Sequence, residues 1–188
     1  MEPSDETLCQ RVAGGDEAAF DLLVGRHRER VYRVAWSVLR DAEDARDLSQ
    51  EAFLRLYRTA GSFAGRARFS TWFYRILLNL CFDHLRRHRW WRRRRSPVPT
   101  EDQPPAALAA AAEPPPDPSA ALDDRRRAAR LWEAVGRLSA QQRAALLLQV
   151  QEGFTTAEIA AVLECAEATV RVHLHRAVSR LRQMVEVR

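Results

Sequence analysis

The stretch that decides the fold is TTAEIAAVLECAEATVRVHLHRAVSRLR, residues 155–182. Thr155 and Glu158 have the spacing of a capping box, which predicts the start of a short helix. A tight break follows at residues 164–166, and a longer helix with apolar residues at helical spacing comes after it. This order is typical of a helix-turn-helix, whose second helix enters the major groove of DNA.

The longer helix has an apolar face and a polar face. At about 100° per residue its inward face holds Val170, Leu174, Ala177 and Val178. Its first turns carry the residues that we expect to contact DNA, which are Thr169, Arg171, Val172, His175 and Arg176. An ordinary amphipathic helix with a solvated polar face is the alternative. A helix-turn-helix alone does not distinguish a repressor from other DNA-binding proteins.

The rest of the chain divides into helical segments and one linker. Apolar residues recur at helical spacing over Asp16–Leu39, over Ala42–Thr59 and from near Ser70, and Ser139 begins a second capping box. Eight of the nine prolines fall within residues 97–118, in a stretch rich in alanine. We therefore expect an all-α protein with two small helical domains, residues 1–95 and 123–188, joined by a linker at residues 96–122.

Charge is distributed unevenly along these segments. The chain of 188 residues has a net charge of +5, made up of +6 in residues 1–95, −4 in the linker and +3 in residues 123–188. Two basic domains on an acidic tether favour a polyanionic partner. No apolar run is long enough to cross a membrane, and the three cysteines are scattered. We expect a cytoplasmic protein without membrane insertion.

The helix predicted at Ala42–Thr59 carries acids and one leucine opposite its apolar face. Asp44, Asp47, Glu51 and Leu54 share this outward face. Acidic residues near the start of a helix interact favourably with the helix dipole, and this interaction explains the positions of these acids reasonably well. The dipole does not explain Leu54 among charges, which hints at a protein-binding surface. The sequence leaves both explanations open.

The stretch SFAGRARFSTWFYRILLNLCFDHLRRHRWWRRRR, residues 62–95, interleaves arginines with aromatic residues. Such a surface suits single-stranded nucleic acid, because charge follows the backbone while rings stack on unpaired bases. The candidates are Phe63, Arg66, Arg68, Phe69, Trp72, Arg75, Asn79 and Arg86. The alternative places most aromatics in the core, as we expect for Phe73 and Tyr74. The arginine run at its end also suits a general polyanion patch or a membrane surface.

We expect no catalytic residues, no cofactor and no metal site. The chain has no recognisable nucleophile–base set or phosphate-binding glycine loop. Cys81, His84 and His88 have spacings that suit a metal, but their surroundings are strongly cationic.

Three segments in this order resemble the extracytoplasmic-function (ECF) group of bacterial RNA polymerase sigma factors, in the sigma-70 family. Residues 41–58 are similar to the family segment that binds the clamp of the polymerase β′ subunit. Residues 63–87 are similar to the segment that melts and reads the −10 element, and residues 138–177 to the domain that reads the −35 element.

The resemblance implies roles for the candidate residues. Asp44, Asp47, Gln50, Glu51 and Leu54 would face the polymerase, the aromatic and arginine residues would surround the melted strand near Gly65, and the helix-turn-helix would sit at −35. Further implied partners are the β flap and an anti-sigma protein. The turn departs from the family pattern, with Glu164 in place of the usual glycine. The rival interpretations are a helix-turn-helix regulator that acts without being a polymerase subunit, and an arginine-rich RNA-binding protein.

Overall fold

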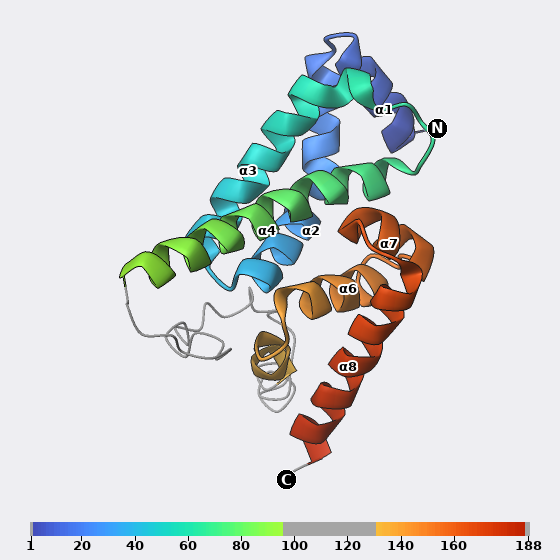
Figure 1. The fold of residues 1–188 in the computed structure, drawn as a ribbon. Helices are drawn as coiled ribbons and strands as arrows, with labels where there is room; N and C mark the ends of the chain where they lie inside the picture. Colours follow the sequence, from blue (N-terminus) through green and yellow to red (C-terminus); the bar gives the residue numbers. More distant parts are fainter. Residues whose placement is uncertain (1, 96–130, 187–188) are drawn as a thin grey trace, which may run out of the picture.

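The computed structural model describes residues 2–95 and 131–186, and every regular element in these ranges is helical. The predicted all-α class is confirmed. The elements are α1 (Asp5–Ala13), α2 (Glu17–Leu39), α3 (Ala42–Thr59), the 3-10 turn η1 (Ala60–Ser62), α4 (Phe69–Arg95), a helical segment at residues 131–136, α6 (Ala140–Val150), α7 (Thr156–Leu163) and α8 (Glu167–Glu186) (Figure 1).

Side-chain caps set the helix boundaries. Asp16 accepts a hydrogen bond from the N–H of Ala19 at the start of α2, and Asp41 accepts from two backbone amides at the start of α3. The capping boxes predicted at Ser139 and Thr155 are both present. Each cap satisfies amides that a helix start leaves without partners, so the sequence fixes these boundaries locally.

The first helix was not expected from the sequence pattern. Ser4 caps α1 by accepting from the N–H of Thr7, and the helix buries Leu8, Cys9 and Val12. The Glu6 carboxylate accepts a hydrogen bond from the N–H of Phe69, at 3.1 Å, and so caps the start of α4 from 63 residues away. This contact lowers the pKa of Glu6.

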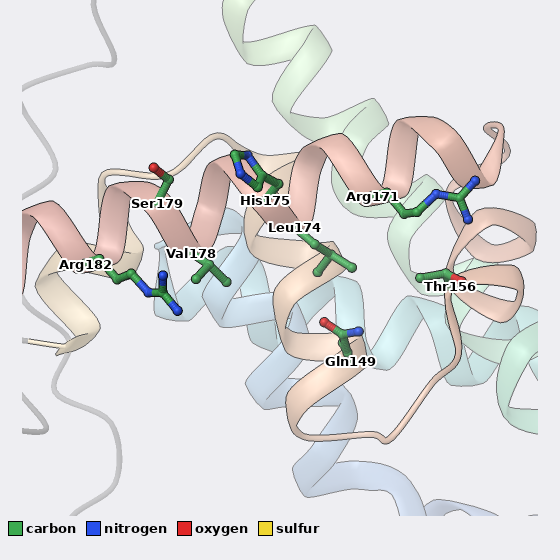
Figure 2. Close-up of a pocket in the computed structure, with 8 residues that line it drawn as sticks. All are labelled: Gln149, Thr156, Arg171, Leu174, His175, Val178, Ser179 and Arg182. Atoms are coloured by element: carbon green, nitrogen blue, oxygen red, sulfur yellow. The ribbon is translucent and has the colours of Figure 1, made fainter.

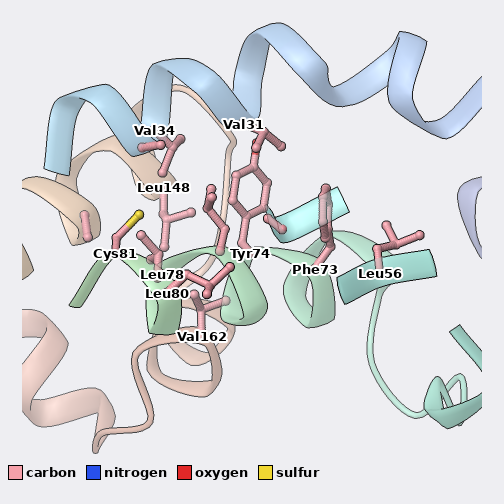
Figure 3. Close-up of a cluster of buried hydrophobic side chains, with 14 of the residues drawn as sticks. Val31, Val34, Leu56, Phe73, Tyr74, Leu78, Leu80, Cys81, Leu148 and Val162 are labelled. Carbon is pink, nitrogen blue, oxygen red and sulfur yellow. The ribbon is translucent and has the colours of Figure 1, made fainter. Parts of the chain in front are cut away.

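Helix α4 is apolar on two sides. Phe73 and Tyr74 are buried, as expected; Leu77 is buried with Phe73, and Leu78 and Cys81 are buried with Tyr74 on an adjoining strip. Figure 3 shows Leu78 and Cys81 beside Leu148 of α6, with Val162 of α7 close by. The Tyr74 and Phe154 rings pack in a T-shaped arrangement, with centroids 5.6 Å apart. The second strip is therefore covered by the C-terminal helices.

The N-terminal and C-terminal helices thus share one continuous core. Helix α4 packs against α7, and α2 packs against α6 (Figure 1). The sequence predicted two tethered domains and did not predict this packing. The predicted linker, residues 96–122, lies outside the described residues.

Two arginines lie where α2 meets the C-terminal helices. Arg143 is 8% exposed and donates to the carbonyls of Val38, Gly136 and Leu138, with a distance of 2.7 Å to Val38. Arg40 stacks on Trp36, with 4.5 Å from its guanidinium carbon to the ring centroid. Neither arginine has an ion-pair partner among the described residues. Burial, together with the charge of Arg40, lowers the pKa of Arg143 to about 10.

No helix in the described ranges is long and apolar enough to cross a membrane.

Candidate polymerase and nucleic-acid interfaces

The outward face of α3 carries the acidic residues and the leucine that the sequence singled out. Asp47 and Gln50 are exposed, and Leu54 is 48% exposed. The opposite face of α3 is buried, because Ala45, Ala52 and Leu56 pack into the core.

Two of these acids have partners on the protein. Asp44 is half-buried, and its Oδ2 lies 2.9 Å from Nε2 of His84 on α4. Glu51 pairs with Arg55 one turn later, at 3.1 Å. Both carboxylates keep part of their surface open to solvent, where ion pairs contribute little stability, so they remain available to a protein partner.

Tyr57 extends this face and was not among the expected residues. It is exposed, and it lies three residues after Leu54, on the same side of α3. Its ring packs in a T-shaped arrangement with Phe20 of α2, with centroids 5.2 Å apart. The spacing from Leu54 is the signal that points to it. An exposed leucine and an exposed tyrosine among acids are typical of a protein-binding surface.

The outward face of α4 carries polar and cationic residues. Arg75 and Asn79 are exposed, and Trp72 at the edge is half-buried. The Trp72 ring packs against Phe63 from the preceding loop, with centroids 5.3 Å apart. Both rings keep part of their surface accessible, which is the requirement for stacking on an unpaired base.

Phe69 does not fit the expectation for a base-stacking residue. It is fully buried, where its ring stacks on Phe73 with centroids 5.6 Å apart. It also contacts Phe63 and Trp72, so it supports the accessible rings from below. Phe82, later in α4, is half-buried against the core. Both residues follow the alternative in which aromatics of this segment serve packing.

The loop before α4 adds the remaining arginines. Arg66 and Arg68 are exposed, and Gly65 has a φ of 68°, a backbone conformation that glycine adopts without strain. Arg68 pairs with Glu158 of α7 at 3.3 Å, so this loop touches the C-terminal helices. Arg86 is exposed and is paired with Asp83.

The helix-turn-helix is formed by α7 and α8, and Glu164 makes its turn. Glu164 has a φ of 52°, in the left-handed region where the usual residue is glycine. Helix α8 buries Val170, Leu174 and Ala177, as predicted. All the residues expected to contact DNA are exposed, namely Thr169, Arg171, Val172, His175 and Arg176.

Val178 departs from the predicted inward face. It is 40% exposed and lines a groove of about 470 Å³ along α8 (Figure 2). The other lining residues are Gln149, Thr156, Arg171, Leu174, His175, Ser179 and Arg182. Figure 2 shows Leu174 and Val178 on the side of α8 that faces α6. The groove therefore joins the polar face of α8 to an apolar floor.

Two family models match the chain, and together they cover most of it. Residues 23–91 match Sigma-70 region 2, and residues 128–181 match Sigma-70, region 4. The RNA polymerase sigma-H factor of Pseudomonas aeruginosa is 34% identical over 94% of this chain and 91% of its own length. The ECF RNA polymerase sigma factor SigM of Mycobacterium tuberculosis is 35% identical over 98% of this chain and 86% of its own. The chain belongs to the ECF RNA polymerase sigma factors.

The structural comparison gives the same fold. The sigma factor RpoE, in a co-crystal structure with the anti-sigma factor NepR from Bartonella quintana, matches 89% of this chain with a TM-score of 0.72 and 23% identity, and 97% of RpoE is covered. CnrH, solved with the cytosolic domain of CnrY, matches 98% of this chain and 98% of its own, with a TM-score of 0.68 and 22% identity.

The regions of this sigma factor coincide with the surfaces described above. The region 2 match contains all of α3, which carries the acidic outward face. It also contains most of α4, which carries the outward face with Arg75 and Asn79. The region 4 match contains α6, α7 and most of α8. As members of this family do, the protein directs RNA polymerase to promoters at the start of transcription.

Proposed function

We propose that residues 1–95 form a domain that binds core polymerase through α3 and holds the opened −10 element on α4, and that residues 123–188 read the −35 element. The observation that carries this proposal is the pairing of two exposed faces within one small helical unit. An acidic face with Leu54 lies on α3, and a cationic face with Arg75 and Trp72 lies on the neighbouring α4. The first face suits a basic protein surface and the second suits single-stranded DNA.

The energetics of strand opening are compatible with this small surface. Unpairing and flipping a base costs a few kcal/mol. Stacking on an aromatic ring returns roughly 1–3 kcal/mol per base. Phe63 and Trp72 offer two partly accessible rings, and Arg66, Arg68 and Arg75 add phosphate contacts nearby. These contacts offset much of the cost of flipping about two bases once polymerase has positioned the DNA.

The helix-turn-helix supplies duplex recognition. Arg171, Val172, His175 and Arg176 project from the first turns of α8, where a recognition helix meets base edges. The adjoining groove has an apolar floor at Leu174 and Val178, and we assign it to the β flap of the polymerase.

The packed arrangement must open before both promoter elements are read. The elements lie about 17 base pairs apart in this family, or roughly 58 Å at 3.4 Å per step. Here the −10 loop touches the helix-turn-helix directly, because Arg68 pairs with Glu158. Thr156, in the same helix as Glu158, bonds Glu167 at the start of α8, so the two DNA-reading surfaces lie far closer than that spacing. Docking on polymerase would separate them.

We extend to this chain the anti-sigma control seen in the structural relative RpoE, which was captured with an anti-sigma factor. The packed arrangement gives such a partner a single surface to hold. The protein would act in the cytoplasm, where polymerase works, as a polymerase subunit that performs no chemistry of its own.

Transcription from a genomic fragment library, with purified core polymerase, tests this assignment. The parent protein should bind core polymerase and direct specific transcripts, and Arg75→Ala with Asn79→Ala should reduce permanganate reactivity at −10 while core binding stays intact. Arg28→Ala is the matched control, because it removes an exposed arginine from α2 and so changes the net charge by the same amount. A parent protein that bound duplex sites alone and ignored core polymerase would favour the helix-turn-helix regulator instead.

A further inference from the structure

Helices α3 and α4 bring together three side chains that are common transition-metal ligands. Asp44, His84 and His88 each offer one ligand atom, and these atoms all lie within 4.8 Å of one another. His84 Nε2 lies 2.9 Å from Asp44 Oδ2, and the two histidine rings stack with centroids 4.4 Å apart. We propose that these residues form a binding site for a divalent transition-metal ion of the Zn²⁺, Co²⁺ or Ni²⁺ type.

The donor set and its spacing suit such an ion. Two imidazoles and one carboxylate form a zinc ligand set with a fourth position open to water. Histidines four residues apart on one helix project from the same face, as they do in helical zinc motifs. Zinc bonds of about 2.0–2.1 Å place tetrahedral ligand atoms about 3.3 Å apart. The His84–Asp44 pair is already close to this separation, and the exposed His88 ring would turn out of its stack on His84 to complete the set.

The cysteine that shares the sequence spacing is not part of this site. Cys81 is fully buried on the strip of α4 that faces α6 (Figure 3), and burial raises the pKa of its thiol to about 12. A buried, protonated thiol is a poor metal ligand. Asp44 supplies the third donor from 40 residues earlier in the chain.

The main effect that opposes metal binding is the positive charge of α4. This charge is the reason why no metal site is expected from the sequence. Arg86 is paired with Asp83 one turn away, so part of this charge is offset. The Asp44 carboxylate adds a negative charge at the site itself. The bonds between the metal ion and the His84 and His88 nitrogens are short. The exposed arginines repel the ion from farther away and through water, and the water weakens this repulsion.

Direct binding to the full-length chain tests the proposal without reference to polymerase. The protein, stripped with a chelator, is titrated with Zn²⁺ by calorimetry and with Co²⁺ by visible absorption. We expect one ion per chain, with affinity at least about tenfold weaker in His88→Ala and in Asp44→Asn. His175→Ala, which removes another exposed histidine, and Cys165→Ser should bind as the parent does.

Circular dichroism identifies any variant that fails to fold, and His88→Ala should fold because His88 is exposed. Zn²⁺ should raise the melting temperature of the parent by more than that of His88→Ala at the same concentration. The proposal is overturned by a parent that binds neither ion saturably, by unchanged binding in the Asp44 and His88 variants, or by a cobalt spectrum with a thiolate charge-transfer band. None of these outcomes bears on the assigned role in transcription.

Discussion

Replacing Gly136 with aspartate should hold the two packed halves of the protein together. Gly136 lies at the end of the helical segment at residues 131–136, and a Cβ built on it would be 3.2 Å from Nη2 of Arg40. The tip of a long arginine side chain can shift by the few tenths of an ångström that this requires. Arg143 donates to the carbonyl of the same glycine, at 3.1 Å. An aspartate here would lie against Arg40, with Arg143 bound to the carbonyl of the same residue.

The expected gain follows from the state of these two cations. Burial lowers the pKa of Arg40, and burial with the charge of Arg40 lowers that of Arg143 to about 10. The cost of keeping Arg143 charged is thus roughly 3 kcal/mol. A carboxylate about 4 Å away attracts one guanidinium by at most about 4 kcal/mol at an effective dielectric constant of 20. After desolvation of the carboxylate we expect about 1–2 kcal/mol net, or about tenfold in the ratio of packed to open molecules.

Energy transfer between dyes measures this ratio directly. Cysteines introduced at the exposed Glu29 of α2 and Gln183 of α8, in a Cys165→Ser background, report separation of the two halves. Gly136→Asp should retain high transfer to higher urea concentrations than the parent. Gly136→Asn has nearly the same shape without the charge, so the difference between the two variants isolates the electrostatic effect. Equal behaviour of aspartate and asparagine would refute the idea that unpaired arginine charge weakens this interface.

Three further predictions address the polymerase face, the helix-turn-helix and the N-terminal cap. Leu54→Arg should weaken core polymerase binding at least about tenfold in fluorescence anisotropy while changing the free energy of unfolding by less than about 0.5 kcal/mol, because Leu54 is exposed. Thr155→Ala should destabilise the C-terminal helices by about 1 kcal/mol in urea, whereas Thr155→Ser should not, because the hydroxyl accepts from the N–H of Glu158 at 3.2 Å. The pKa of Glu6 is lowered by the N–H of Phe69, so its contribution to stability is complete above the ordinary glutamate pKa of about 4.3 and is lost as the pH falls through and below it. Glu6→Gln should therefore make unfolding less sensitive to acid in this range, and a melting-temperature profile that matches the parent's would contradict the cap.

Several groups acquired their surroundings only through the tertiary structure. The spacing of Cys81, His84 and His88 suits a metal, although their cationic surroundings predict no metal site; the structure places Cys81 in the core and Asp44, from another helix, beside the two histidines. The sequence predicts that Phe69 stacks on an unpaired base, but Phe69 is buried in the core. Periodicity assigns a face to each side chain, but it does not say which neighbour covers that face.

The sequence by itself determined most of the helices, although not α1, together with the capping boxes at Ser139 and Thr155 and the helix-turn-helix, because each depends on contacts within a few residues. It also determined which faces of α3 and α8 point outward, because the apolar face of a helix is buried and the opposite face is therefore exposed. The tertiary structure alone decided that Glu6 caps α4, that Arg143 binds the end of α2, and that the strip with Tyr74 and Leu78 is covered by the C-terminal helices. These contacts join residues far apart in the chain, and nothing in local spacing encodes which distant surface satisfies a buried carbonyl or an exposed apolar strip.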